Sequence, residues 1–204
     1  MTITLNATTG ISTPPVSVLG DTSGSITFAA PAVAGTNTQT LVAVTGTLAP
    51  LLAATAQAST SGTSIDFTSI PSWVKRITVM FSGVSTNSTN PIQVQIGSGS
   101  YTVTGYNATS GRFSVSTNSS NSTVGFIITS PGASDITSGN LILANLTSNT
   151  WVASFSGKAS TTVCCVAAGD VSLSGTLDRL RIVGSTTGLP TDTFDAGSIN
   201  ILYE

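Results

Sequence analysis

The chain has 204 residues, of which only 7% are charged, against about a quarter in an average protein, and its formal net charge is −2. The six basic residues are scattered, so the composition excludes the electrostatic footprint that a nucleic-acid-binding protein needs. Histidine is absent and the only glutamate is Glu204, which excludes a Ser-His-Asp triad and leaves few groups for acid–base chemistry. We therefore expect a protein that is not an enzyme and uses no cofactor.

Serine, threonine, asparagine and glycine dominate the polar residues, and these types disfavour helices and suit short strands joined by turns. Hydrophobic residues still make up 40% of the chain, enough for a packed core. The N-terminal residues lack the basic and apolar regions of a signal peptide, and no window is apolar enough to insert in a membrane. The sequence thus predicts an all-β protein that stays in the cytoplasm in which it is made, or leaves it inside a particle released by lysis.

Residues 1–45 form the first predicted unit, with candidate strands at Ser25–Ala29 and Gln39–Val44. This segment is too short to bury a core by itself. Its strand edges would invite pairing with another chain, so we interpret it as an attachment or oligomerisation segment.

Residues 46–63 are a linker or a short helix. Leu51–Ala58 has fair helix propensity, and Pro50 suits a first helical position.

Residues 64–204 alternate in hydrophobicity as an antiparallel β-sandwich does, and the number of strands favours a jelly-roll-like arrangement. In Ile77–Phe81 every second residue is apolar, and in Leu177–Val183 the apolar Leu180 and Ile182 alternate with Arg179 and Arg181. The predicted strands are Ser64–Ser69, Val74–Gly83, Ile92–Ile96, Tyr101–Thr104, Arg112–Ser116, Val124–Thr129, Asn140–Leu146, Trp151–Ser156, Thr161–Ala167, Ser172–Leu173, Leu177–Val183 and Ser198–Tyr203. Predicted turns between them include Asn118–Asn121, Gly157 and Gly169–Asp170.

Groups that could hold a metal are sparse. Asp192 and Asp195 lie three apart in a predicted loop, where aspartate more often makes a turn than binds a cation. The adjacent Cys164 and Cys165 are interpreted as small residues of a buried strand, because neighbouring cysteines rarely bridge. We predict no metal site.

Binding is the function class that the residues leave open, through aromatic side chains beside polar loops. Tyr101, Tyr106 and Arg112 are candidates for an exposed receptor-contacting patch. Trp73 and Trp151 are interpreted instead as core or intersubunit packing residues.

Four strings resemble a C-terminal β-domain found at the ends of bacteriophage tail proteins, tail fibres in particular. They are Ile65-Asp-Phe-Thr-Ser-Ile-Pro-Ser-Trp-Val-Lys-Arg-Ile-Thr-Val-Met-Phe, Ile92-Gln-Val-Gln-Ile-Gly-Ser-Gly, Leu173-Ser-Gly-Thr-Leu-Asp-Arg-Leu-Arg-Ile, and Phe194-Asp-Ala-Gly-Ser-Ile-Asn-Ile-Leu-Tyr-Glu. The resemblance runs from about Thr63 to Glu204, and little shaft precedes it.

The resemblance implies a structural virion protein: a short tail fibre or spike, homotrimeric, attached to other virion proteins by its N-terminus. Its β-sandwich would adhere to a glycan or protein of the host surface. A capsid decoration or head-fibre protein without a receptor role is the alternative. A non-viral adhesin or lectin-like module is a third possibility.

Overall fold

The computed structural model describes residues 16–19, 25–28, 50–115, 117–129 and 135–204, and it divides the chain into two units, Met1–Thr47 and Leu48–Glu204. In the first unit, β1 (Val16–Leu19) pairs antiparallel with β2 (Ser25–Phe28). Strand β2 confirms the predicted strand at Ser25–Ala29. The other predicted strand, Gln39–Val44, lies outside the described residues.

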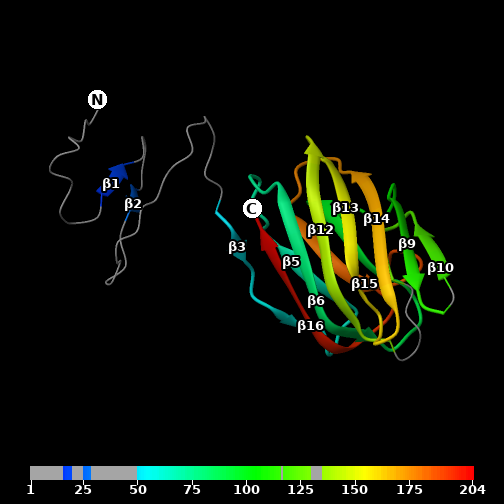
Figure 1. The fold of residues 1–204 in the computed structure, drawn as a ribbon. Helices are drawn as coiled ribbons and strands as arrows, with labels where there is room; N and C mark the ends of the chain where they lie inside the picture. The colour runs from blue at the N-terminus through cyan, green and yellow to red at the C-terminus, as the bar shows by residue number, and fades with distance from the viewer. Residues whose placement is uncertain (1–15, 20–24, 29–49, 116, 130–134) are drawn as a thin grey trace, which may run out of the picture. The chain divides into compact units, whose positions relative to one another are not determined.

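The second unit is a sandwich of two antiparallel sheets, which confirms the predicted fold class (Figure 1). The nine-stranded sheet runs β10-β9-β14-β13-β12-β6-β16-β3, and β4 also pairs with β16. Its strands are β3 (Leu52–Ala53), β4 (Gln57–Ala58), β6 (Arg76–Thr86), β9 (Asn107–Phe113), β10 (Thr117–Ser122), β12 (Thr137–Thr147), β13 (Thr150–Lys158), β14 (Cys164–Ser172) and β16 (Phe194–Tyr203).

The five-stranded sheet runs β11-β7-β15-β5, with the short β8 paired to β7. Its strands are β5 (Ser64–Thr68), β7 (Ile92–Ser98), β8 (Ser100–Tyr101), β11 (Phe126–Thr129) and β15 (Arg179–Gly184). Among the residues that the structure describes, β5 pairs with β15 alone and is therefore an edge strand.

The core lies between the two sheets and follows the alternation of the sequence. In β6 every second side chain points inward, so that Ile77 and Val79 are fully buried while Arg76 is exposed. Full burial of one such side chain contributes about 1.5–3 kcal/mol. Other fully buried side chains come from both sheets and include Leu141, Leu143, Leu180, Ile182, Ile96 and Phe126.

Two glycines allow β12 and β13 to approach each other closely. Gly139 and Gly157 are cross-strand partners, and a Cβ on Gly157 would lie 2.6 Å from the Phe155 ring and 2.4 Å from a backbone oxygen. The Phe155 ring lies where side chains at positions 139 and 157 would otherwise be. The same ring packs edge-on against Phe81, with the ring centres 6.0 Å apart.

The prediction of a short helix at Leu51–Ala58 is wrong. This stretch is extended, and β3 and β4 within it pair with β16. Tertiary pairing with β16 outweighs a weak local helix propensity. The sandwich unit therefore begins at Leu48, before the predicted boundary at residue 64.

Three predicted turns also lie inside strands. Asn118–Asn121 belongs to β10, Gly157 to β13 and Gly169–Asp170 to β14. Long pairing with neighbouring strands accommodates these turn-type residues, as in the register Gly169↔Ala108.

Within the described residues, no helix is long and apolar enough to cross a membrane.

Candidate functional site

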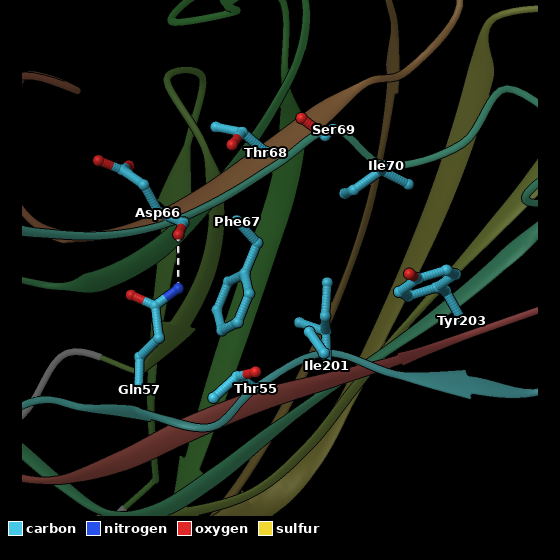
Figure 2. Close-up of a pocket in the computed structure, with 10 residues that line it drawn as sticks. Thr55, Gln57, Asp66, Phe67, Thr68, Ser69, Ile70, Ile201 and Tyr203 are labelled. Atoms are coloured by element: carbon cyan, nitrogen blue, oxygen red, sulfur yellow. Dashed lines mark hydrogen bonds between the residues drawn. The ribbon is translucent and has the colours of Figure 1, made fainter.

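A groove opens at the side of the sandwich where the edge strand β5 faces β3, β4 and β16 of the other sheet (Figure 2). We call it the β5 groove; its volume is about 280 Å³. Its lining residues come from the segment after β3, from β5 and the turn that follows it, and from the end of β16: Ala54, Thr55, Gln57, Asp66, Phe67, Thr68, Ser69, Ile70, Ile201 and Tyr203.

The alternation of β5 shapes the groove. Ile65 and Phe67 are buried while Asp66 and Thr68 are exposed, so the strand presents an apolar inner side and a polar outer side. In Figure 2 the Phe67 ring points toward Ile201 of β16, and the side chains of Asp66 and Thr68 point the other way.

One hydrogen bond joins the two sheets across the groove. The Nε2 of Gln57 donates to the backbone oxygen of Asp66 at 2.6 Å (Figure 2). This contact gives a carbonyl group of the edge strand β5 a side-chain partner from the other sheet.

The turn after β5 closes the groove at the other end. Ser69 adopts φ 61°, an unusual backbone conformation for a residue other than glycine. The next residue, Ile70, is buried and donates its N–H to the oxygen of Asp178 at 2.9 Å. Backbone strain of this kind is often found at binding sites.

The groove combines an apolar floor with a polar rim. Phe67, Ile70 and Ile201 are buried at its floor, and the side chains of Thr55, Gln57 and Ser69 carry hydroxyl and amide groups around it. Its volume lies just below the usual range of about 300–1,000 Å³ for ligand clefts. It therefore suits one small unit, such as a sugar ring with an apolar face and hydroxyl edges.

On the outer face of the five-stranded sheet lies a charged cluster, which we call the Tyr101 cluster: Asp66 of β5, Tyr101 of β8, and Arg179 and Arg181 of β15. The guanidinium carbon of Arg181 lies 4.4 Å from the centre of the Tyr101 ring, and that of Arg179 lies 5.8 Å away. Arg181 also donates from Nε to Oε1 of Gln95 at 2.7 Å. These contacts hold a half-buried aromatic ring over two cations on the outer face of the small sheet.

The surroundings of the Tyr101 cluster shift the pKa values of two side chains. Burial, together with the charge of Asp66 and a hydrogen bond to its side chain, raises the pKa of Tyr101 to about 12. At the neighbouring position, the hydrogen bond from Arg179 lowers the pKa of Asp178 below its usual value.

The predicted receptor patch of Tyr101, Tyr106 and Arg112 does not form one surface. Tyr106 is buried, with 2% of its surface exposed, and its ring packs edge-on against Phe126 at 5.0 Å. Including it in an exposed patch is therefore wrong, because its hydroxyl is occupied inside the core by the backbone of Ile96. Arg112 lies on β9 of the large sheet and pairs with Asp135 at 2.6 Å.

The two tryptophans lie in different environments. Trp151 is buried in the core, with 3% of its surface exposed. Trp73 is 40% exposed, and its ring centre lies 6.1 Å from that of Tyr203, which lines the groove.

The acidic and cysteine residues considered as metal ligands do not form a metal site. Asp192 is buried and accepts from Nδ2 of Asn90 at 3.0 Å, while the exposed Asp195 accepts a hydrogen bond from Ser85. Both cysteines are unpaired, and only Cys165 is buried; exposure of Cys164 corrects the expectation that both are covered. Among the described residues, no group of three or more histidine, cysteine or acidic side chains is placed to hold a metal ion.

Sequence reasoning missed the β5 groove. Thr55 and Gln57 belong to a stretch interpreted as a linker or helix, and only its pairing with β16 brings them opposite β5. No local signal marks Ser69 as a residue with positive φ. Comparison with known proteins adds no relative: no family model, no curated protein and no solved structure matches the chain.

Proposed function

We propose that this chain is a structural protein of a bacteriophage virion, a short trimeric tail fibre or spike attached through its N-terminal unit. Its β-sandwich adheres to the host surface, and the β5 groove receives a sugar unit of a surface glycan. The observation that carries the adhesive role is the groove itself, which sets hydroxyl and amide groups around a floor of Phe67, Ile70 and Ile201.

Three further observations support this proposal. The sequence strings quoted above resemble the terminal domain of phage tail proteins. The sandwich unit supplies an all-β scaffold, which suits display of a rigid binding surface. Presentation of several copies on one particle would raise a weak affinity for a single sugar unit into stable attachment.

Adhesion through the groove is tested with a blocking variant. Thr55 is exposed and lines the groove, so Thr55→Trp should fill it and reduce binding of the full chain to an array of bacterial surface polysaccharides by about tenfold or more. Thr60→Trp is the matched control, because Thr60 is also exposed but does not line the groove. Equal binding by Thr55→Trp and the wild-type chain would refute the groove as the site.

The place of the chain in a virion needs a separate experiment. Cryo-electron microscopy of intact particles should find trimers at the tail or baseplate. Copies spread over the head would instead favour a decoration or head-fibre protein, and absence from purified particles would contradict a virion role altogether.

A further inference from the structure

The outer face of the large sheet is almost free of charge. Register places Thr78, Ile142, Ser154, Ala168 and Thr109 side by side in one row across five strands. The adjacent row consists of Met80, Asn140, Ser156, Val166 and Gly111. We call these two rows the outer face; neither contains an ionisable side chain.

The charged residues on this side of the sheet lie toward the ends of their strands. Arg76 begins β6 and pairs with Glu204, Lys158 ends β13, and Asp170 lies near the end of β14. An antiparallel sheet that faces water on one side normally alternates apolar and polar residues. Here the middle of the face instead exposes Ile142 by 41% and Val166 by 45%. Depletion of charge at the centre with charges at the margin is typical of a protein–protein interface.

The large sheet offers enough area around the outer face for a stable contact. Strands β16, β6, β12, β13, β14 and β9 lie next to one another in the sheet (Figure 1). At about 4.8 Å between strands and about 3.3 Å per residue, these six strands together offer a surface of roughly 24 by 27 Å, on the order of 650 Å², with the two uncharged rows at its centre. A standard interface buries about 600–1,000 Å² on each partner, so the contact would cover the outer face and the rows that flank it.

The face also carries a projection and a hollow side by side. The exposed Ile142 stands on β12, and a shallow hollow of about 520 Å³ lies over β13, β14, β9 and β10. Asn107, Thr109, Val152, Ala168 and Asp170 are among the residues that line this hollow. Since every copy of the chain presents the same projection and hollow, a second copy can fill the hollow of the first with its own apolar side chain.

We propose that the outer face of the nine-stranded sheet is the surface through which one sandwich unit packs against a second copy of this chain. The contact excludes water from Ile142 and Val166 and leaves Arg76 and Lys158 at its solvated margin. This interface is independent of the β5 groove, whose lining residues lie at the edge of the sandwich.

Two thiol probes in the full chain test the interface. In a Cys164→Ser background, Ser154→Cys places a thiol at the centre of the outer face, and Thr193→Cys places one at an exposed position away from it. At a protein concentration at which the chain is assembled, maleimide should alkylate the Ser154→Cys thiol about tenfold or more slowly than the Thr193→Cys thiol. The thiol at position 154 would react only when the contact between the two copies opens. The two thiols should react at similar rates when the protein is diluted until it dissociates, or when both variants also carry the substitution Ile142→Lys.

The mass of the full chain, measured by light scattering, accompanies the alkylation rates. An assembly held only by residues 1–47 would retain its mass but leave the Ser154→Cys thiol fully reactive, and this result would overturn the proposal. A monomeric mass for the wild-type chain would overturn it too. If Ile142→Lys does not fold, as judged by circular dichroism, Val166→Glu on the neighbouring row takes its place.

Discussion

Replacement of Tyr106 by phenylalanine should destabilise the sandwich without any loss of packing volume. The hydroxyl of Tyr106 accepts a hydrogen bond from the backbone N–H of Ile96 at 2.8 Å and lies 3.3 Å from the backbone oxygen of the same residue. The oxygen keeps a second donor, because the N–H of Thr102 binds it at 3.0 Å. The N–H of Ile96 loses this partner inside the core, where Ile96 is fully buried.

An unsatisfied buried donor costs about 1–3 kcal/mol, whereas loss of an exposed hydroxyl costs little. We therefore expect Tyr106→Phe to lower the free energy of unfolding by about 1–3 kcal/mol, and the Tm by about 2–4 °C for each kcal/mol in a unit of this size. Denaturant titration followed by tryptophan fluorescence measures the effect, since Trp151 is buried in the same core.

Tyr203→Phe is the matched control, because it makes the same chemical change in a half-buried residue that lines the β5 groove. It should change the free energy of unfolding by less than about 0.5 kcal/mol. Equal effects of the two substitutions, or no measurable effect of Tyr106→Phe, would refute the reasoning, because the buried N–H of Ile96 would then not depend on the Tyr106 hydroxyl.

Two further predictions concern the strands and the tyrosines. Gly157→Ala should lower the free energy of unfolding by about 1–3 kcal/mol, because its Cβ would lie 2.4 Å from the backbone oxygen of Ser138. Gly99→Ala is the control: Gly99 has a positive φ but open space around it, so this substitution measures the cost of backbone strain without a steric clash. If thermal unfolding shows Gly157→Ala to be as stable as the wild-type chain, the close approach of β12 and β13 is wrong. Stability should also fall as the pH rises above about 10, since burial raises the pKa of Tyr101 to about 12 and raises that of Tyr106 above its ordinary value of 10.0. The folded state then retains protons that the unfolded chain has already released, so the loss begins at the unfolded pKa and continues through the folded one. Unfolding midpoints that do not change between pH 9 and pH 11 would contradict the buried placement of Tyr106.

The amino-acid sequence by itself determined the fold class and the direction in which most core residues face. Period-two alternation in β6, β15 and β16 identifies Ile77, Leu180 and Ile201 as inward residues, because successive side chains of a strand point to opposite faces. The absence of histidine and the scarcity of carboxylates likewise restrict the acid–base chemistry open to the chain, whatever its fold.

Only the tertiary structure decided which strands are neighbours, and the candidate sites depend on that order. Leu52–Ala58 is extended because β16 offers it an edge, although its local propensity favours a helix. Tyr101 and Tyr106 are five residues apart and both aromatic, yet one lies over Arg181 at the surface and the other is buried against Phe126. The β5 groove and the outer face arise from pairings between residues distant in the sequence, such as Ile142↔Thr78 and Leu202↔Ala53. Such contacts depend on the packing of the whole sandwich, and local patterns of residues do not encode them.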